Sequence, residues 1–408
     1  MKILVLTTLY PNSQQPRHGI FIENRVLNFK AMFPDTEIRV MAAIPWFPGA
    51  SGIFGEYAKY AQIPRTESRH NLTIYHPRYP VIPKIGMNLA PMLMAMALLP
   101  KLKQLLRDGF DFDIIDCHYF FPDGVAATWL ARKLGKPVTI TARGSDIHLI
   151  PQYRLPKRMI NWALRNCTQA IAVCKALADE MQLLEPNCQD VKVARNGVDL
   201  VKFSPEENRD KLRRLLNISG FNLLSVGNLI ELKGHHLIIE ALTSLPDIHL
   251  CIAGNGPLEG SLKKQVKELN LENRVTFLGL LNQQELRDYY AASDALILAS
   301  SREGWANVLL ESMACGTPVI ATAIWGTPEV VASDDAGLLI PERSVEHIIL
   351  TIQQLVDNPP DRSAVRAYAE KFSWQQTSQL LFEIYTQAIS VQNQESISLS
   401  LCRFCQIK

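Results

Sequence analysis

Two glutamates, Glu303 and Glu311, flank the start of a predicted helix that begins near Asn307. The free N–H groups of its first turn, including those of Val308 and Leu309, form an anion site. Carboxylates accept hydrogen bonds from neighbouring pairs of hydroxyls. A sugar on one side of a bound diphosphate and a ribose on the other would therefore satisfy both glutamates, although a single glutamate is usually just exposed to solvent.

A second candidate segment, residues 225–234, leaves the first predicted strand of the second half of the chain. It carries Lys233, a cation that suits a diphosphate bound at the neighbouring helix start. The glycine-rich turn at residues 253–260 has three residues between its last two glycines, whereas a dinucleotide fingerprint has two. We interpret that turn as structural.

Further polar residues lie at predicted strand ends in the first half of the chain. Gly19 opens a helix after the first strand and would let the backbone approach a diphosphate closely. His118, Arg143 and Asp146 follow later strands, and sites of α/β sheets form beyond the carboxyl ends of strands. Arginine stays protonated, so Arg143 would act through its charge and not as a general base.

Strand-like and helical segments alternate along the chain, which predicts parallel sheets with crossover helices. The expected strands are residues 2–7, 37–42, 114–116, 137–141, 170–173 and 191–194, then 222–226, 249–253, 275–277, 295–298 and 318–321. The clearest helices are residues 19–32, 124–134, 157–166, 258–269, 283–291 and 307–314. Two such sets in 408 residues predict an α/β protein of two doubly wound, Rossmann-like domains with the site in a cleft between them.

The segment at residues 301–320 resembles the E-x7-E motif of the retaining glycosyltransferases of family 4, which have the two-domain GT-B fold. The family typically reads E-G-[FW]-[GP]-x-V-x-L-E-A-M-A-x-G-x-P-V-[IV]-A, and this chain departs at Ala306 and Ser312, both small residues. The resemblance implies that Glu303 holds hydroxyls of the donor sugar and that Glu311 holds the ribose.

The resemblance extends to the loop that contains Lys233, where the family reads G-R-L-x-x-x-K-G. Lys233 matches the lysine, whereas Asn228 replaces the arginine and leaves Lys233 as the only cation of this loop. The resemblance implies that Lys233 and the N–H groups of Val308 and Leu309 bind the donor diphosphate. A later G-G-x-x-E run of the family is also matched, with Trp325 in place of its first glycine.

In the first half, the family often reads H-G-x-D where this chain has Arg143, Gly144, Ser145 and Asp146. His118 corresponds to a cleft histidine of the family. The resemblance therefore implies catalytic contacts from Glu303, His118, Arg143 and Asp146. It implies transfer of a hexose from a nucleoside-diphosphate sugar to a saccharide or lipid-linked hydroxyl acceptor, with retention and with no cofactor, in envelope polysaccharide or glycolipid synthesis.

These patterns define expected domain boundaries. Residues 1–199 form the acceptor-side domain, the charged residues 200–219 form a linker, and residues 220–372 form the donor-binding domain. Residues 373–390 resemble the helix that crosses back onto the first domain in this family. Residues 391–408, rich in serine and glutamine, are expected to be poorly ordered.

Composition narrows the classes of partner. A net charge of +2 argues against a nucleic-acid partner, and eight cysteines without framework spacing suit a reducing cytoplasm. Cys402 and Cys405 form a C-x-x-C without the second pair that a zinc ribbon needs. Asp111 and Asp113 form a D-x-D sequence, which in other proteins can bind a metal. It lies before a predicted strand and not after one, so it points away from the predicted site. We therefore predict no catalytic metal.

The longest apolar stretch, residues 89–99, contains Pro91 and stops before Pro100. It is about half of the ~20 residues that a membrane span needs, so we predict that the chain does not cross a membrane. Lys84, Lys101, Lys103 and Arg107 flank this stretch, which predicts peripheral contact with the inner face of the plasma membrane. A core helix with a basic outer face is the open alternative.

Three other functions compete with a glycosyltransferase. A sugar-nucleotide epimerase can share the fold and needs no acceptor. A nicotinamide-dependent dehydrogenase needs a proper G-x-G-x-x-G and an acid at the next strand end, and neither is present. A catalytically silent carbohydrate-binding protein would not need Glu303, Lys233 and Glu311, so the presence of these residues argues against this third alternative.

Overall fold

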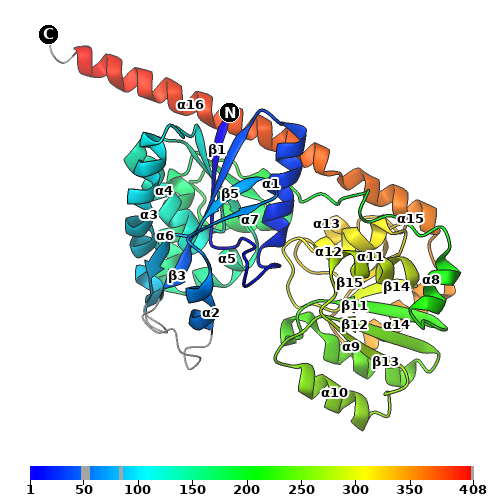
Figure 1. The fold of residues 1–408 in the computed structure, drawn as a ribbon. Helices are drawn as coiled ribbons and strands as arrows, with labels where there is room; N and C mark the ends of the chain where they lie inside the picture. Colours follow the sequence, from blue (N-terminus) through cyan, green and yellow to red (C-terminus); the bar gives the residue numbers. More distant parts are fainter. Residues whose placement is uncertain (47–55, 82–85, 406–408) are drawn as a thin grey trace. The chain divides into compact units, whose positions relative to one another are not determined.

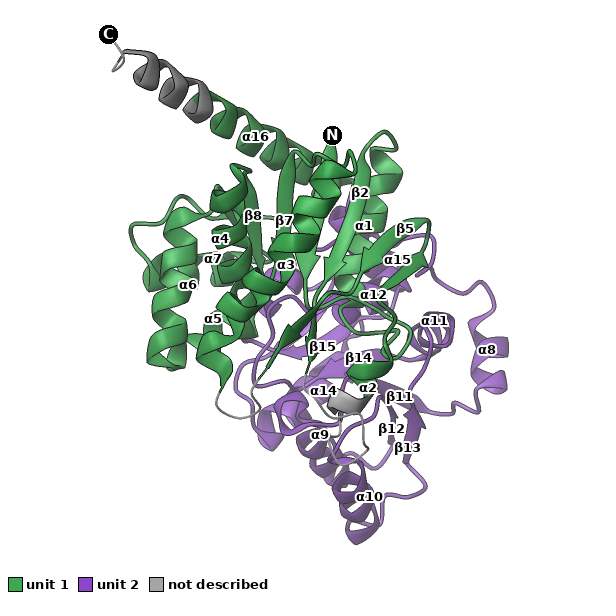
Figure 2. Ribbon diagram, turned by 60° about the vertical axis from the view of Figure 1, so that its left-hand side comes forward, with its two compact units in different colours: residues 1–195, 375–408 green, residues 196–374 purple. Residues whose placement is uncertain are grey.

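The computed structural model describes residues 1–46, 56–81 and 86–405. The chain divides into two compact units (Figures 1 and 2). Unit 1 comprises Met1–Arg195 and Gln375–Lys408, and unit 2 comprises Asn196–Trp374. The predicted α/β class with doubly wound parallel sheets is confirmed.

Unit 1 is built on an eight-stranded sheet of order β10-β9-β8-β7-β1-β2-β5-β4. Neighbouring strands are parallel, except that β4 pairs antiparallel with β5. The chain starts in β1, adds strands on one side and then on the other, so the order reverses between β1 and β7. The strands are β1 (Lys2–Thr7), β2 (Glu37–Ala42), β4 (Thr66–Arg69), β5 (Leu72–Tyr75), β7 (Ile114–His118), β8 (Val138–Ala142), β9 (Gln169–Ala172) and β10 (Lys192–Val193).

Helices cover this sheet as a doubly wound fold requires. Side chains of α1 and of the carboxyl-terminal helix α16 share one core with β1, β2 and β5. The helices α3, α4 and α6 pack side by side in another layer (Figure 1). The helices of unit 1 are α1 (Ile20–Met32), α2 (Glu56–Gln62), α3 (Ala90–Arg107), α4 (Val125–Leu134), α5 (Ser145–His148), α6 (Arg154–Asn166), α7 (Lys175–Leu184) and α16 (Trp374–Cys405).

Unit 2 contains a six-stranded, fully parallel sheet of order β13-β12-β11-β14-β15-β16. The order reverses between β11 and β14. Its strands are β11 (Phe221–Val226), β12 (Ile248–Ala253), β13 (Val275–Gly279), β14 (Ala295–Leu298), β15 (Val319–Thr322) and β16 (Gly337–Ile340). Its helices are α8 (Arg209–Leu215), α9 (His235–Ala241), α10 (Glu259–Glu268), α11 (Gln283–Ala292), α12 (Asn307–Ala314), α13 (Thr327–Val330), α14 (Val345–Asp357) and α15 (Arg362–Ala369).

The segment predicted as a linker, residues 200–219, is instead a packed part of unit 2 and contains α8. Arg209 and Arg213 anchor it, because both guanidinium groups bind the carboxylate of Asp294, at 2.6 and 3.0 Å. The sequence pattern suggested a solvated linker, but the two arginine side chains form ion pairs with the rest of unit 2.

The carboxyl-terminal helix is also longer than predicted. Instead of ending near residue 390, α16 continues through Cys405, and the side chains beyond residue 394 lie outside the described part. Leu381, Ile384, Tyr385 and Ala388 are buried against unit 1 at helical spacing, whereas Val391 is 40% exposed. The apolar face that the sequence pattern detects therefore ends before the helix does.

The apolar stretch near residue 90 belongs to α3, which passes through Pro100. The helical segment Gly86–Arg107 meets the length and composition of a membrane span, which the shorter predicted stretch did not. Met94, Leu98, Leu102 and Leu105 are buried in unit 1. One face of α3 therefore packs into the core of unit 1, whereas Met92 and Met96 are exposed.

Candidate active site

Two loops of unit 2 meet where the strand order of its sheet reverses. β11 and β14 are parallel neighbours, so the loops that follow them leave the same carboxyl edge of the sheet. In open α/β sheets, this reversal is where ligands bind. The first loop carries Asn228 and Lys233, and the second carries Glu303 and leads into α12.

Lys233 and Glu303 join the two loops directly. The Lys233 Nζ atom lies 2.5 Å from Oε1 of Glu303, and the same oxygen accepts a hydrogen bond from the hydroxyl of Ser300 at 2.7 Å. Both charged side chains are largely buried, with 20% and 12% of their area exposed. The structure therefore brings together two residues that the sequence predicted for one site, although they are 70 positions apart.

Backbone and side-chain hydrogen bonds hold these loops in register. The N–H of Ser301 donates to the carbonyl of Leu232 at 2.8 Å. The Arg343 guanidinium donates to the carbonyls of Ala299 and Glu231, at 2.9 and 3.0 Å. Arg343 stands outside every motif, so no local sequence signal pointed to it.

The start of α12 provides backbone N–H groups of the kind that an anion site needs. Ala306 occupies the N-cap position and has no side-chain oxygen to cap the helix. The N–H of Leu309 donates to the carbonyl of Ala306 at 3.1 Å, so of the two predicted donors Val308 is the better placed to bind an anion. The Asn307 side chain is held by the Asn196 amide at 3.2 Å.

Glu311 lies inside α12 and is partly buried. Its Oε2 atom accepts a hydrogen bond from the Tyr290 hydroxyl at 3.0 Å. Burial raises the pKa of Glu311 to about 7, while the Tyr290 hydroxyl opposes the shift. A carboxyl group in this state can accept or donate a hydrogen bond near neutral pH. Tyr290 is a second site residue that the sequence did not indicate, because it comes from α11.

Asn228 lies exposed in the loop after β11 and is not part of the Lys233–Glu303 pair. Beneath that loop, Gly254 adopts a φ of +147°, and a Cβ atom there would lie 1.9 Å from the carbonyl oxygen of Gly227. Only glycine permits this approach. The structural interpretation of the glycine-rich turn therefore has a physical basis, since the turn supports the loop that carries Asn228.

In unit 1, His118 and Arg143 meet at the carboxyl ends of the neighbouring strands β7 and β8. An Nη2–H of Arg143 points to Nδ1 of His118 at 2.9 Å, and Nε2 of His118 lies 3.2 Å from the Asp116 carboxylate. Burial lowers the pKa of His118 to about 4, with Asp116 opposing this shift and Arg143 adding to it. His118 is thus a neutral imidazole at pH 7, and because Nδ1 faces the Arg143 donor, its proton lies on Nε2.

Asp116 is the centre of this buried network. It accepts a hydrogen bond from the Thr139 hydroxyl at 3.1 Å and another from Tyr385 of α16. Burial opposes ionisation of Asp116, but His118, Tyr385 and Arg25 favour the carboxylate and hold its pKa below the ordinary value. The Asp116 carboxylate therefore carries a negative charge near two arginines, the buried Arg25 and the partly buried Arg143.

His118 and Asp146 were both predicted to be catalytic, but their surroundings favour a positioning role. His118 is fully buried, so it can act on a substrate only through Arg143. One oxygen of Asp146 accepts the N–H groups of Arg143 and Gly144, at 3.0 and 2.8 Å, and the other accepts that of Phe120 at 2.8 Å. Asp146 thereby fixes the backbone that presents Arg143.

Arg143 itself is only partly buried. Its guanidinium lies 5.2 Å from the centre of the Phe21 ring, in a cation–π arrangement. Burial lowers the pKa of Arg143, and Arg25 adds to this, while Asp116 and Asp146 oppose it. Among the predicted residues of unit 1, Arg143 is the one that combines a charge with exposed surface.

Gly19, predicted to approach a diphosphate, is required for a different contact. It precedes α1 with a φ of +69°, and a Cβ atom there would lie 2.2 Å from the carbonyl oxygen of Leu9. The glycine therefore lets the start of α1 pack against the chain that leaves β1.

Asp123 is a buried carboxyl group that sequence reasoning did not single out as a site residue. Its Oδ2 accepts the Thr8 hydroxyl at 2.9 Å, whereas its Oδ1 is buried without a hydrogen-bond partner. Burial raises its pKa to about 7. The Thr8 contact places it beside the end of β1, at the carboxyl edge of the sheet of unit 1.

The D-x-D sequence lies away from this edge. Asp111 pairs with Lys136 at 2.6 Å, and Asp113 accepts the backbone N–H of Lys2 at 2.7 Å, before β7 begins. Within residues 1–46, 56–81 and 86–405, no group of three or more His, Cys, Asp or Glu side chains is arranged to hold a metal ion. The side chains of Cys402 and Cys405 lie outside the described residues.

Comparison with known families divides the chain much as the two sheets do. Residues 206–372 match the family model of glycosyl transferases group 1, and residues 56–202 match that of glycosyltransferase family 4. A putative teichuronic acid biosynthesis glycosyltransferase, TuaC of Bacillus subtilis (strain 168), is 28% identical over 84% of this chain and 86% of its own length. The D-inositol 3-phosphate glycosyltransferase of Arthrobacter sp. (strain FB24) is 30% identical over 68% and 71%, respectively.

Solved structures share the fold at lower identity. Sucrose-phosphate synthase from Thermosynechococcus elongatus aligns with a TM-score of 0.75 and 19% identity, over 96% of this chain and 99% of its own. Anabaena Alr3699/HepE in complex with UDP-glucose aligns with a TM-score of 0.70 and 20% identity, over 95% and 100%. Together with the two family matches, these similarities show that the chain belongs to the glycosyltransferases of group 1 and family 4, with the GT-B fold.

Proposed function

We propose that this glycosyltransferase transfers a hexosyl group from a nucleoside-diphosphate sugar to a hydroxyl acceptor, with retention of the anomeric configuration. The observation that carries the proposal is the Lys233–Glu303 pair, at 2.5 Å, at the strand-order reversal of unit 2 and at the start of α12. It combines one cation, one carboxylate and exposed helix N–H groups, which are the groups that a sugar joined to a diphosphate requires.

On the donor side, we assign a role to each group. Lys233 and the N–H of Val308 bind the diphosphate, where negative charge develops as the glycosidic bond breaks. Glu303 accepts hydrogen bonds from hydroxyls of the transferred sugar, and Glu311 accepts those of the ribose. UDP-glucose, bound in the Anabaena structure, is a nucleotide sugar with this arrangement of groups, so a UDP-sugar is the first donor to test.

The transfer step itself uses the donor's own phosphate. The bond between the anomeric carbon and the diphosphate oxygen breaks, and the acceptor oxygen bonds to that carbon from the same face. The acceptor proton passes to the departing diphosphate oxygen, which conserves atoms and charge. Because no protein base or metal is needed for this step, we propose a metal-independent reaction in which Lys233 and the start of α12 stabilise the leaving group.

For unit 1, we propose that Arg143 supplies a permanent positive charge to phosphate or to a charged acceptor. His118 and Asp146 position Arg143, the first through its side chain and the second through its backbone. The buried Asp116 balances the charge of Arg143 and Arg25.

We propose synthesis of a polysaccharide or glycoconjugate as the biological role, on a saccharide or lipid-linked acceptor. Support comes from the relatives, which include a putative teichuronic acid biosynthesis glycosyltransferase and a D-inositol 3-phosphate glycosyltransferase. The epimerase alternative is not favoured, because both named relatives are described as glycosyltransferases.

We also propose a cytoplasmic location with peripheral contact at the inner face of the plasma membrane. Lys84 lies outside the described residues, and Lys101 and Arg107 line a separate pocket. The better candidate surface is an apolar cavity of about 400 Å³ between α3, α4 and α6. Met92, Met96 and Trp129 line it and expose 42–59% of their areas. Exposed basic residues on α6, namely Arg154, Lys157 and Arg158, would complement anionic lipids.

The central test is transfer with a panel of nucleotide sugars. Thermal stabilisation by each nucleotide sugar identifies the donor, because a ligand that binds only the folded state raises the melting temperature. Incubation of that donor with acceptor sugars and lipid-linked acceptors should then release the nucleoside diphosphate and form a glycoside of retained configuration. Conversion of the donor to another nucleotide sugar without acceptor would instead show an epimerase.

A further inference from the structure

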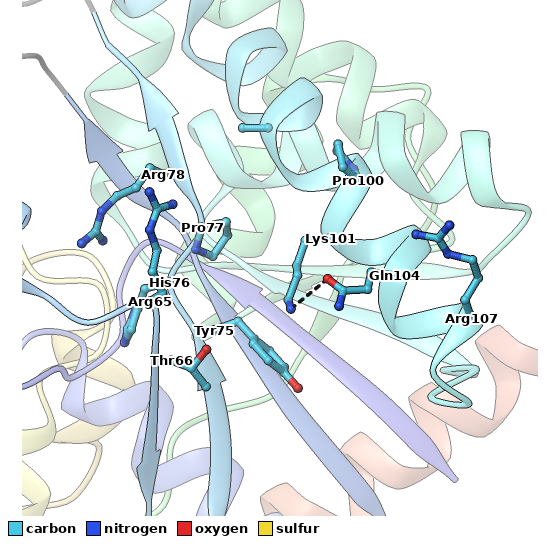
Figure 3. A pocket seen from close by; sticks show the side chains of 11 residues that line it. Arg65, Thr66, Tyr75, His76, Pro77, Arg78, Pro100, Lys101, Gln104 and Arg107 are labelled. Atoms are coloured by element: carbon cyan, nitrogen blue, oxygen red, sulfur yellow. Dashed lines mark hydrogen bonds between the residues drawn. The ribbon is translucent and has the colours of Figure 1, made fainter.

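A cavity of about 500 Å³ in unit 1 lies apart from the residues assigned above (Figure 3). Four cationic side chains line it: Arg65, Arg78, Lys101 and Arg107. They come from elements that are distant in the sequence, since Arg65 precedes β4, Arg78 begins β6 (Arg78–Pro80), and the other two belong to the last turns of α3. The fold therefore concentrates positive charge in one hollow.

The cavity lies at the carboxyl end of β5, near the edge of the sheet of unit 1. His76 and Arg78 follow the carboxyl end of β5, and Arg65 and Thr66 lie at the same end, because β4 runs antiparallel to β5. Ligands of such sheets bind beyond the carboxyl ends of strands. Figure 3 shows Tyr75, the last residue of β5, between the arginines of the strand side and the side chains of α3.

The positive charge of the cavity is not neutralised within the described residues. None of the four cations forms an ion pair with a described carboxylate, and no carboxylate lines the cavity. The carboxylate of Glu67, on β4, is bound to Nε2 of His76 at 2.6 Å. Lys101 instead lies 4.6 Å from the centre of the Tyr75 ring and donates to the Gln104 side chain at 3.2 Å.

Arg78, which lines the cavity, has a buried hydrogen-bond donor without a partner. Its Nη2 donates to the carbonyl of Ile63, whereas Nη1 is buried without a hydrogen-bond partner. Burial lowers the pKa of Arg78, and the nearby Arg65 guanidinium adds to this. Two guanidinium groups held near each other, with a free donor and without a counter-ion, form an arrangement that an added anion would stabilise.

We propose that this cavity binds a phosphate-bearing ligand, with a diphosphate or a sugar phosphate as the matching chemistry. A single carboxylate carries too little charge for four cations, whereas a diphosphate offers several charged oxygens and suits the forked donors of arginine. The volume leaves room for a sugar ring beside the phosphate. If the proposed transfer is correct, the ligand is the phosphorylated part of the acceptor. This identification of the ligand as part of the acceptor rests on the proposed function, whereas the binding of phosphate in the cavity does not.

Titration of the purified full-length protein with inorganic pyrophosphate, at low ionic strength, tests the proposal without any turnover. Pyrophosphate can also bind the donor loop, so each variant is made in a Lys233→Ala background. We expect Arg65→Gln and Lys101→Gln each to weaken pyrophosphate binding by about tenfold or more, since a charge-assisted hydrogen bond contributes about 1.5–3 kcal/mol. Both residues lie at the surface of the cavity, so the fold should be retained.

The matched control is Lys103→Gln, which removes an exposed charge from the same helix outside the cavity. It should change the affinity by less than about twofold, because a screened surface charge contributes little. Equal affinity of the Arg65, Lys101 and Lys103 variants would overturn the proposal. Loss of transfer in the Lys233→Ala protein, with pyrophosphate binding intact, would separate the donor site from this cavity.

Two further probes identify the source of the phosphate. Glucose 1-phosphate represents a soluble sugar phosphate, and vesicles of phosphatidylcholine with phosphatidylglycerol represent a lipid headgroup. Weaker vesicle binding by both the Arg65→Gln and the Lys101→Gln proteins than by the Lys103 control would support the proposal with a lipid source. A selective loss of glucose 1-phosphate binding in the same two variants would support it with a soluble source.

Discussion

At the residue scale, Glu303 and Glu311 differ in what surrounds their carboxyl groups. Glu303 is paired with Lys233 and Ser300, whereas Glu311 accepts a single hydrogen bond from the buried Tyr290. The first pair joins two loops at the edge of the sheet, and the second joins α11 to α12. The two glutamates should therefore contribute to different steps of the reaction.

We expect Glu311→Ala to raise the KM for the donor roughly tenfold, because a contact to the ribose is equal in the ground and transition states. Glu303→Gln should instead lower kcat by about tenfold or more, since the charge near the reacting sugar changes during transfer. Initial rates over a range of donor concentrations separate the two effects. Tyr290→Phe is the control that removes the partner of Glu311 but keeps its carboxyl group. The reverse pattern would mean that the nucleotide lies in the opposite orientation.

Arg143 gives a second prediction at this scale. Arg143→Lys keeps the charge but loses the forked geometry, so activity should fall about tenfold, or about 1.4 kcal/mol of transition-state stabilisation. Arg143→His should be less active at pH 8 than at pH 6, because an imidazole with an ordinary pKa of about 6.5 is charged only at the lower pH.

The test is a pH profile from 6 to 8.5 with saturating donor. His118 does not contribute to that profile in the wild type, since its pKa of about 4 lies below the range. Arg132→Lys, on the exposed surface of α4, serves as the matched control. Wild-type behaviour of both Arg143 variants would assign this residue to structure alone.

At the scale of elements, α16 links the carboxyl terminus to the buried network of unit 1. Its residues Leu381, Ile384 and Ala388 pack with α1 and the sheet, and Phe382 stacks on Phe33 with ring centres 4.4 Å apart. The same helix delivers Tyr385 to Asp116. The part of α16 before residue 390 is therefore needed for unit 1.

We expect deletion of residues 391–408 to leave activity and Tm nearly unchanged, because Val391 and the next residues are largely exposed. Leu381→Ala should cost about 2–5 kcal/mol and lower Tm by roughly 5 °C or more, since it removes a buried side chain. Thermal unfolding of both proteins makes the comparison. A large destabilisation by the deletion would show that the distal part of the helix packs on the protein.

At the scale of the whole molecule, the carboxyl group of Glu311 makes stability depend on pH. Burial raises the folded pKa of Glu311 to about 7, above its ordinary value of 4.5. The folded state therefore holds a proton that the unfolded state releases between those values. Stability from this group is fully present below pH 4.5 and is lost as the pH rises to 7.

We expect Glu311→Gln to remove this loss, because the amide does not ionise. From pH 4.5 to pH 8, the free energy of unfolding of the variant should therefore rise by about 1–3 kcal/mol relative to that of the wild type. Urea unfolding at both pH values measures the difference. The opposite contribution of His118, whose lowered pKa favours higher pH, is present in both proteins and cancels. The exposed Glu240→Gln is the control, and an equal pH response of the two variants would contradict the assignment.

Membrane association is also a property of the whole molecule. We expect the protein to float with vesicles that contain anionic lipid at low salt, and a Met92→Ser, Met96→Ser double variant to lose this binding, because both side chains are more than half exposed. Leu350→Ser, an equally exposed apolar residue on α14, should float like wild type. Absence of wild-type flotation would leave the apolar cavity without a lipid partner.

The sequence alone determined the two-sheet architecture, and it pointed to Lys233 and Glu303 as residues of the proposed donor site. Runs of buried apolar residues, each followed by a turn and a helix, specify parallel strands, so the strands at Lys2–Thr7, Glu37–Ala42 and Ala295–Leu298 have the predicted bounds. Parallel strands of one sheet share a carboxyl edge. Lys233 and Glu303 could therefore be assigned to one site before their contact was seen.

Only the tertiary structure determined which side chains face one another across elements. Arg343 holds the two loops through the carbonyls of Ala299 and Glu231, although it lies outside every motif. Tyr290 and Tyr385 reach Glu311 and Asp116 from helices that carry no motif. The burial of His118 and the cluster around Arg78 also depend on contacts over tens to hundreds of positions. Periodicity reports the face of a single element, whereas burial, pKa and unpaired charge depend on what a second element places against that face.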